Sequence, residues 1–256
     1  MNDFAIILGV SSGMGEAAAI ELISKGINIY GIDIRKSNEL LDNLESIGKK
    51  NNASVYFKKM SATNSEKRLE VINELLCIDN IRVKILLHSL AFGALKPFIN
   101  SEKNETITKQ NIDMTLDVMA NSLIYWSQDL FHNNLLKRGS QILAMTSSGG
   151  HKQWSTYGAV SMAKAALESA SRQLALELAP YNIASNSIQA GVTDTPALRK
   201  IPGNEKMITN AINTNPNKRL TTPLDIAKVV SMIGLSEQSW VTGNTIRADG
   251  GEDITG

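Results

Sequence analysis

Short apolar runs alternate with longer amphipathic segments along the whole chain. Most of the runs show no alternation of polarity, which is typical of strands covered on both faces of a parallel sheet. They predict strands at residues 4–8, 28–32, 54–58, 83–88, 141–146, 183–189 and 245–248. The amphipathic segments predict helices at residues 13–25, 37–49, 65–77, 112–136, 155–178 and 224–234. This strand–helix–strand repetition predicts an α/β fold, a doubly wound parallel sheet of about seven strands with helices on both faces.

The chain shows no internal boundary. No Pro/Ser-rich linker, repeat or low-complexity tract divides the 256 residues, so we expect one domain over residues 1–256. Its least regular segment, residues 192–219, contains Pro196, Pro202 and Pro216 and follows a predicted strand. A connection of this length is more often a functional flap than a plain loop. We therefore expect a substrate-binding lid there, with an inert surface excursion as the alternative.

Composition narrows the classes of partner. The net charge is +1 and acids and bases are interspersed, so we expect no nucleic-acid partner. No apolar run reaches the ~20 residues of a membrane span, and no targeting segment is evident, so we expect a cytoplasmic protein without a membrane partner.

His88, His132 and His151 lack metal-ligand spacing, so no metal site is expected. The single cysteine, Cys77, stands in an apolar run and is expected to be a buried, inert thiol.

A glycine-rich turn joins the first predicted strand to the first predicted helix. Glycine permits a sharp turn and a close backbone approach to a ligand, and a helix N-terminus directs its amides at an anion. In this strand–turn–helix context the turn predicts a dinucleotide pyrophosphate site. Its residues are Gly9, Ser11, Ser12, Gly13, Met14 and Gly15.

Asp33 ends the second predicted strand and bears on the choice of cofactor. A carboxylate there accepts hydrogen bonds from the adenosine ribose and repels a 2′-phosphate. Arg35 and Lys36 follow at once and are able to hold that phosphate instead. NAD(H) is therefore favoured and NADP(H) remains the alternative. Asp33 acting only as a cap of the next turn is a third reading.

Tyr157 and Lys164 are the strongest candidates for chemistry. They stand seven residues apart in a predicted helix, and at about 3.6 residues per turn this places both on one face, roughly 10 Å apart. With Ser147 shortly before them, the pair suggests a proton donor and a cation that stabilises its anion. An unperturbed phenol has a pKa near 10, so the cation is expected to ease proton release.

Taken together, these features resemble the short-chain dehydrogenase/reductase family over essentially the whole chain. Residues 9–15 look like its cofactor turn, and residues 242–251 are similar to its C-terminal signature. Residues 190–195, Ala-Gly-Val-Thr-Asp-Thr, occupy the place of the segment that holds the nicotinamide carboxamide. The resemblance implies a Rossmann-type fold.

Several departures from the usual family pattern resemble one divergent branch, the enoyl-acyl-carrier-protein reductases. Most members separate the catalytic tyrosine and lysine by three residues, whereas this chain separates them by six and carries Val160 at the usual tyrosine position. Residues 88–92, His-Ser-Leu-Ala-Phe, and Ala190 also look like that branch. Ser147 fills the slot of an auxiliary tyrosine, and Met119 that of a relay asparagine. The resemblance is thus to a serine-bearing subtype.

The resemblance implies reduction of the carbon–carbon double bond of trans-2-enoyl thioesters, in fatty acid biosynthesis. The acyl group would be carried on acyl carrier protein or coenzyme A. Tyr157 would donate to the thioester oxygen and Lys164 would support it while binding the nicotinamide ribose. Ser147 would give a second hydrogen bond or orient the phenol. A homotetramer or homodimer is also implied.

The same resemblance extends the predicted site along the chain. Further cofactor contacts are expected at Ser61, Ala62, Ser89, Leu90, Ala91, Gly191, Val192 and Thr195. An apolar acyl pocket is expected at Phe92, Trp154, Met162, Leu198, Ile201 and Met207, for which plain core packing is the alternative.

Two other functions remain open. A reductase of 3-oxoacyl thioesters or of another carbonyl substrate is supported by Ser147 and opposed by the tyrosine spacing and Met119. A non-catalytic dinucleotide-binding subunit is opposed by the retention of Tyr157 and Lys164.

Overall fold

A parallel sheet runs through the centre of the protein, whose computed structural model describes residues 1–255. Within that range seven strands lie in the order β3-β2-β1-β4-β5-β6-β7, and every neighbouring pair is parallel. The strands are β1 Asn2–Leu8, β2 Asn28–Asp33, β3 Val55–Lys59, β4 Ile81–His88, β5 Gln141–Ser147, β6 Ala184–Ala190 and β7 Thr245–Ala248. The predicted Rossmann-type α/β fold is confirmed, and each predicted strand boundary lies within two residues of the observed one.

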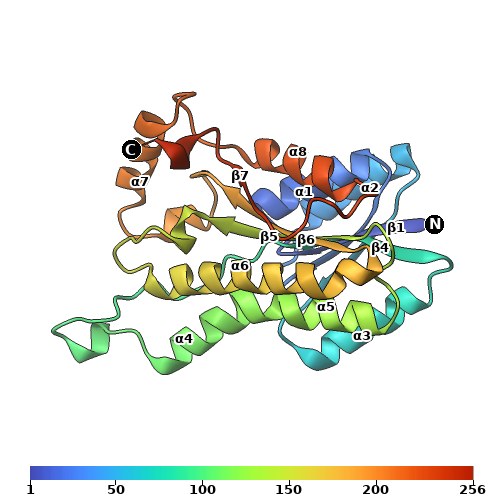
Figure 1. Ribbon diagram of the computed structural model, residues 1–256, viewed down its shortest axis with the longest axis horizontal. Coiled ribbons are helices and arrows are strands. Elements are labelled where there is room, and N and C mark those ends of the chain that lie inside the picture. The colour runs from blue at the N-terminus through green and yellow to red at the C-terminus, as the bar shows by residue number, and fades with distance from the viewer. Residues whose placement is uncertain (256) are drawn as a thin grey trace.

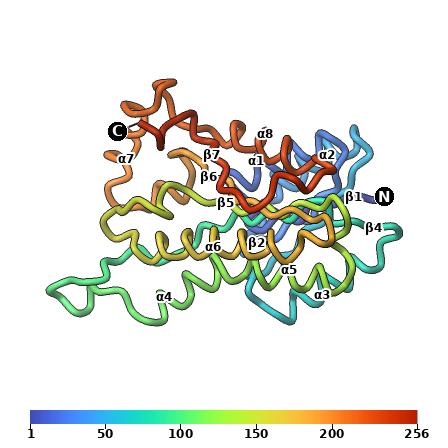
Figure 2. Tube along the Cα trace, viewed as in Figure 1, coloured from blue at the N-terminus to red at the C-terminus, as the bar shows by residue number. Residues whose placement is uncertain are grey.

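Helices cover both faces of this sheet (Figure 1). α1, α2 and α8 lie on one face, and α3, α4, α5 and α6 lie on the other. Their bounds are α1 Gly13–Ser24, α2 Asn38–Asn51, α3 Ser65–Leu76, α4 Lys109–Leu116, α5 Ser122–His132, α6 Gly158–Leu178, α7 Asn204–Thr214 and α8 Pro223–Gly234. The C-terminal segment and α7 lie together at the end of the molecule opposite the N-terminus (Figure 2).

β1 shows why the strands read as unbroken apolar runs. Phe4, Ile6 and Leu8 pack into the core cluster on one face of the sheet. Ala5 and Ile7 point to the other face and pack against residues of α1 and α8. Successive strand side chains point to opposite faces, and both faces are dry here, so no position requires a polar residue.

The direction of chain winding reverses beside β1. This strand pairs with β2 on one side and with β4 on the other, so Leu8 lies between Ile32 and His88. In open α/β sheets such a reversal leaves a crevice beyond the carboxyl ends of the strands. The site is therefore expected at the ends of β1 and β4.

One predicted helix is confirmed as a continuous helical stretch, over residues 109–132, but it contains a π-helical turn. The amphipathic pattern predicts a single helix over residues 112–136, whereas the structure has α4, then a π-helical turn, η2 Asp117–Asn121, and then α5. The turn carries the buried side chains of Met119 and Ala120. A π turn inserts a residue without changing local polarity, so the sequence pattern does not reveal it.

Two further elements differ from the prediction. α6 begins at Gly158 rather than at residue 155, because Thr156 has a φ of 64°, in the left-handed region, which a helix cannot contain. The segment predicted to be irregular, residues 192–219, holds the short helix η5 Leu198–Lys200 and the eleven-residue helix α7.

The prediction of a buried Cys77 is also wrong. The side chain is exposed, because Cys77 is the C-terminal cap of α3 and lies beyond Leu75, the last buried residue of that helix.

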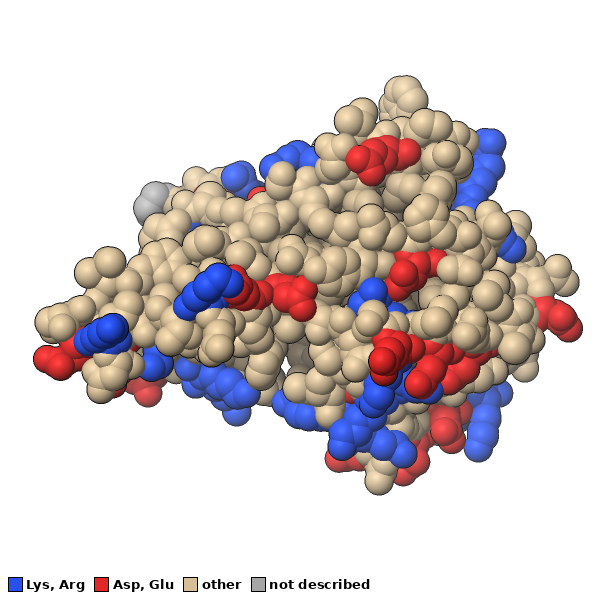
Figure 3. Space-filling view, turned by 90° about the horizontal axis from the view of Figure 1, so that it is seen from below, with Lys and Arg blue, Asp and Glu red and all other residues tan. Residues whose placement is uncertain are grey.

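Charged side chains of both signs lie beside one another on the face shown in Figure 3. Direct ion pairs in the structure include Arg68 of α3 with Asp129 of α5 and Lys58 of β3 with Glu74 of α3. No helix among the described residues is long and apolar enough to cross a membrane. Within residues 1–255 no group of three or more His, Cys, Asp or Glu side chains is placed to hold a metal ion.

Candidate active site

A cavity of about 990 Å³ lies at the carboxyl ends of the central strands. Its walls come from the turn after β1, the ends of β2, β4, β5 and β6, and the segment that includes α7. Predicted cofactor residues that line it are Gly9, Ser12, Gly13, Met14, Asp33, Ser61, Ala62, Ser89, Leu90, Ala91, Gly191, Val192 and Thr195. Ser147, Tyr157 and Lys164 line it too, with Phe92, Trp154, Leu198, Ile201 and Met207.

The glycine turn forms a cradle that only glycine permits. Gly9 has a φ of 90°, and a Cβ there would lie 2.4 Å from the Ser89 carbonyl oxygen. A Cβ on Gly15 would lie 2.1 Å from the Gly9 carbonyl oxygen. The N-cap Ser12 makes no side-chain hydrogen bond to the first turn of α1, so that helix end is not capped by its own chain. The turn thus fits a pyrophosphate, which would accept from those amides.

Asp33 and Arg35 meet at the end of β2. The Asp33 carboxylate accepts from the Ser11 amide at 3.2 Å and from the Arg35 amide at 3.0 Å. The Arg35 guanidinium donates to the Ser12 hydroxyl at 3.2 Å. Asp33 therefore caps the following turn and also faces the cavity, where Arg35 stands beside it. The capping role of Asp33 is thus observed, and its contact with the adenosine ribose stays a prediction.

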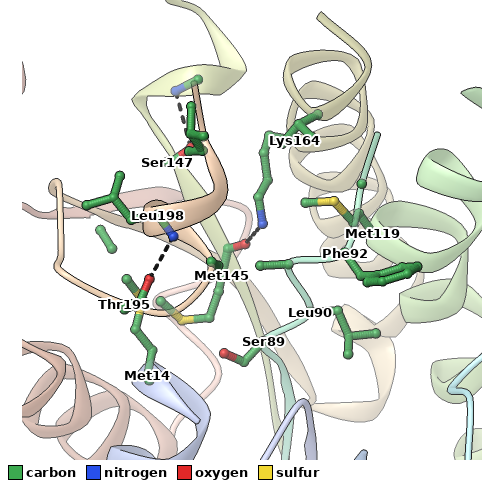
Figure 4. Close-up of a pocket in the computed structure, with 18 of the residues that line it drawn as sticks. Met14, Ser89, Leu90, Phe92, Met119, Met145, Ser147, Lys164, Thr195 and Leu198 are labelled. Carbon is green, nitrogen blue, oxygen red and sulfur yellow. Dashed lines mark hydrogen bonds between the residues drawn. The ribbon is translucent and has the colours of Figure 1, made fainter. Parts of the chain in front are cut away.

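Lys164 reaches into the cavity from α6 and turns toward β5 (Figure 4). Its side chain is buried, and Nζ donates to the Met145 carbonyl oxygen at 2.6 Å. Burial lowers the pKa of Lys164 to about 8, although the Glu168 carboxylate one turn further along α6 opposes the change. Glu168 is itself held by the Thr146 hydroxyl, which donates to it at 2.6 Å.

Tyr157 stands at the N-cap of α6, beside Ser147 at the end of β5. A Cβ on Gly149 would lie 2.8 Å from the Tyr157 ring and 3.1 Å from Ser147 Oγ, so both groups border this glycine. Burial raises the pKa of the Tyr157 phenol, and the Ser147 hydroxyl offsets part of the rise. The expectation that a lysine cation eases proton release stays a prediction: the Lys164 ammonium donates to the Met145 carbonyl oxygen here, and the net shift of the Tyr157 pKa is upward. The phenol therefore stays protonated and is a hydrogen-bond donor.

A small apolar cluster packs against Tyr157. Met119, Val160 and Ala163 form it, with Tyr157 packed against it. Met119 comes from the π turn and lines the cavity, as Figure 4 shows. Met119 occupies the position of the relay asparagine and Val160 that of the usual tyrosine, and the two side chains belong to one apolar cluster.

Three predicted residues do not face the cavity. Ser11 turns its hydroxyl to the Arg35 carbonyl oxygen, at 2.9 Å. Gly15 packs against the Gly9 backbone, so it shapes the turn rather than lining it. The prediction that Met162 belongs to the acyl pocket is wrong: its side chain is exposed, because α6 buries the positions on either side of it, Ser161 and Ala163.

Further residues that were not predicted from the sequence also line the cavity. Glu252 and Thr255 line the cavity, as do Asn210 and Thr214 of α7 and Lys152 of the loop after β5. Glu252 follows the C-terminal signature directly, and this adjacency was the one available signal. Its carboxylate accepts from the Val192 amide.

Comparisons with known proteins agree with this architecture. A family model described as Enoyl-(Acyl carrier protein) reductase matches residues 9–252. A tropinone reductase homolog of Arabidopsis thaliana is 26% identical over 98% of this chain and 94% of its own length. The NADH-dependent enoyl-[acyl-carrier-protein] reductase of Synechocystis sp. is 31% identical over 68% of this chain and 66% of its own length.

A solved structure supports the fold over the whole chain. The enoyl-[acyl-carrier-protein] reductase (NADH) of Aquifex aeolicus superimposes with a TM-score of 0.81 at 22% identity, covering 99% of this chain and 97% of that one. The family model, the sheet order and the cavity at the carboxyl ends of β1 and β4 point to one conclusion. The chain belongs to the short-chain dehydrogenase/reductase family, in the group described as Enoyl-(Acyl carrier protein) reductase.

Proposed function

We propose that this protein reduces the carbon–carbon double bond of trans-2-enoyl thioesters in fatty acid biosynthesis. The family consists of NAD(P)H-dependent oxidoreductases, and a bound nicotinamide supplies the hydride. The observation that carries the proposal is the apolar cluster of Met119, Val160 and Ala163 beside Tyr157. It leaves Tyr157 and Ser147 as the hydroxyl donors at this wall of the cavity, without an asparagine relay behind them.

Each catalytic group has a task that its surroundings support. Negative charge develops on the thioester oxygen during reduction, and a preorganised donor aimed at that oxygen lowers the barrier. Tyr157 provides this donor, because burial keeps its phenol protonated. Ser147 orients the phenol or donates a second hydrogen bond. Lys164 supplies a positive charge below about pH 8 and binds the nicotinamide ribose.

The rest of the cavity suits an acyl chain and a dinucleotide. Leu198, Ile201 and Met207 line it from the segment 192–219, which we propose acts as a lid. Trp154 anchors that segment, since its indole nitrogen donates to the Pro202 carbonyl oxygen at 3.1 Å. Asp33 favours NAD(H), as in the Synechocystis relative, whose name specifies NADH.

The test follows the loss of reduced-nicotinamide absorbance with crotonyl and acetoacetyl thioesters of coenzyme A. We expect turnover of the crotonyl thioester, and a fall of about 100-fold or more in kcat for Tyr157→Phe, because the variant lacks the donor. Tyr181→Phe is the matched control: this tyrosine is exposed and lies outside the cavity, so its turnover should equal that of the wild type. Turnover of the acetoacetyl thioester alone would exclude the proposal.

A carbonyl reductase is the second candidate. Ser147 beside Tyr157 supports it, and so does the whole-length match to a tropinone reductase homolog. The acetoacetyl arm of the same assay measures this activity directly. Cofactor binding without turnover of either thioester would instead favour a non-catalytic dinucleotide-binding subunit.

A further inference from the structure

The segment after β7 folds back over the cavity and brings a carboxylate to it. Glu252, at the start of the short helix η6 Glu252–Ile254, accepts from the Val192 amide through both oxygens, at 3.1 and 3.4 Å. Val192 follows Gly191 directly after β6, and both residues line the cavity together with Glu252. The Glu252 carboxylate is thus hydrogen-bonded to the Val192 amide. The resemblance described above predicts that Val192 contacts the nicotinamide carboxamide.

Neighbouring contacts hold Glu252 in this place. The side chain of Asp253 is buried and accepts from Lys152 at 2.7 Å and from Gln189 at 3.0 Å. The Thr255 hydroxyl donates to the Thr214 carbonyl oxygen at the end of α7, at 3.0 Å. The segment is therefore tied to the loop after β5, to β6 and to α7, and Glu252 lies between these anchors.

The position is also shaped for a carboxylate. A Cβ on Gly191 would lie 3.0 Å from Glu252 Oε2, so any larger residue at 191 would crowd the carboxylate. Burial raises the pKa of Glu252, and the Asp249 and Asp253 carboxylates act in the same direction while Lys152 and the Val192 amide oppose them. A desolvated carboxylate of this kind needs hydrogen-bond donors, and within its own chain the structure gives it the Val192 amide.

A primary carboxamide complements this pair of groups. Its oxygen accepts one hydrogen bond and its NH₂ group donates two. We propose that Val192 and Glu252 form a carboxamide clamp, in which the Val192 amide exchanges its hydrogen bond to Glu252 for one to the carboxamide oxygen and the released carboxylate accepts from the NH₂ group. This inference rests on the proposed function, because it requires a nicotinamide cofactor in this cavity. Glu252 then becomes a residue that determines how strongly the oxidised cofactor is preferred over the reduced one.

The clamp has an electrostatic consequence. The oxidised nicotinamide ring is positively charged and the reduced ring is neutral, so a carboxylate beside the carboxamide stabilises the oxidised form. Even at a separation of about 10 Å, with an effective dielectric constant of about 20, this preference amounts to about tenfold in affinity. Glu252 therefore sets the ratio of the dissociation constants for the oxidised and the reduced dinucleotide.

The test measures dissociation constants for NAD⁺ and NADH by calorimetry and by quenching of tryptophan fluorescence, since Trp154 lines the cavity. We expect Glu252→Gln to raise the Kd for NAD⁺ about tenfold relative to that for NADH, because the substitution removes charge while keeping shape. Glu177→Gln on the exposed side of α6 changes the net charge equally and lies outside the cavity, so it should leave the ratio unchanged.

A second measurement needs no variant and guards against a variant that fails to fold. The wild-type protein should bind 3-acetylpyridine adenine dinucleotide at least about tenfold more weakly than NAD⁺, because the acetyl group keeps the acceptor oxygen and lacks the NH₂ donor. Equal affinity for the two dinucleotides would overturn the clamp. So would equal tightening of NAD⁺ and NADH in Glu252→Gln, which would show that Glu252 merely competes for the Val192 amide.

These outcomes separate the inference from the proposed function. Binding of both dinucleotides with a ratio that Glu252→Gln leaves unchanged contradicts the clamp alone. Failure of the wild-type protein to bind any nicotinamide dinucleotide contradicts both.

Discussion

Lys164 is a buried ammonium that titrates close to the physiological range. Burial lowers its pKa to about 8, and its Nζ donates to the Met145 carbonyl oxygen. The seven-residue spacing identifies Tyr157 and Lys164 as partners from the sequence. It does not indicate where the ammonium points, because the rotamer depends on β5 packing beneath α6. The same holds for the phenol, whose raised pKa arises from burial that the sequence does not display.

The titration of Lys164 predicts a pH profile. The group is cationic below about pH 8 and neutral above it, and the proposed reaction needs the cation. We therefore expect kcat/KM to fall as pH rises through about 8, since this parameter reports the ionisation of the free enzyme. Arginine stays protonated throughout this range, so a folded Lys164→Arg variant should lose that decline, whatever its absolute rate. A wild-type profile that is flat between pH 7 and 9.5 would contradict this assignment.

The π turn is the element that adapts the long helix to the site. It turns Met119 into the cavity wall and brings Ser122 under the end of β4. Ser122 donates to the Val118 carbonyl oxygen at 2.8 Å, and its oxygen lies 2.9 Å from His88 Nε2. Burial, with the charge of Lys164, lowers the pKa of His88 to about 3, so the imidazole stays neutral. With its own proton directed to Val118, Ser122 accepts from Nε2–H of His88.

We expect Ser122→Ala to lower the free energy of unfolding by about 1–3 kcal/mol, because it leaves a buried imidazole donor without a partner. Ser127→Ala is the matched control. Ser127 is also buried on α5 and donates to the carbonyl oxygen four residues earlier, Leu123, at 2.8 Å. Its hydroxyl has no imidazole partner, so the loss should be smaller. Urea unfolding of both variants provides the comparison, and equal losses would show that the His88 contact contributes nothing.

The strands and the glycine turn were predictable from the sequence, whereas α7 and the position of Glu252 were not. Strands that are buried on both faces are recognisable in the sequence as apolar runs, and glycines mark the turn after β1. α7 was missed because Pro202 and Pro216 flank it closely and polar residues fill most of its length. Glu252 was missed as a site residue because its approach to Val192 depends on a tertiary fold-back between β6 and the segment after β7.

At the scale of the whole molecule, one arginine joins distant parts of the chain at the amino ends of the central strands, opposite the cavity. Arg82, near the start of β4, donates to both carboxylate oxygens of Asp3 at 2.7 and 2.6 Å. It also donates to both oxygens of Glu237 at 3.0 and 2.9 Å. The beginning of β1, the beginning of β4 and the segment after α8 therefore meet at one buried guanidinium.

Arg82→Leu should lower the free energy of unfolding by about 2 kcal/mol, since it removes the bidentate guanidinium partner of Asp3 and leaves Glu237 with Lys84, at 3.3 Å, as its counter-ion. This value allows for the partial exposure of Asp3 and Glu237 to solvent. Arg199→Leu removes an arginine with an equally bidentate contact to Asp194 that lies fully on the surface. Its unfolding midpoint should match that of the wild type. Similar midpoints for the two variants in guanidinium chloride would argue against a role for burial.

The two outermost strands of the sheet carry basic side chains. β3 and β7 form the edges of the sheet, and each is short. Lys58 and Lys59 stand on one edge strand and Arg247 on the other, where Arg247 pairs with Asp253 at 3.3 Å. Short, positively charged edges resist the addition of further strands. We therefore expect these edges to disfavour fibril growth by sheet extension.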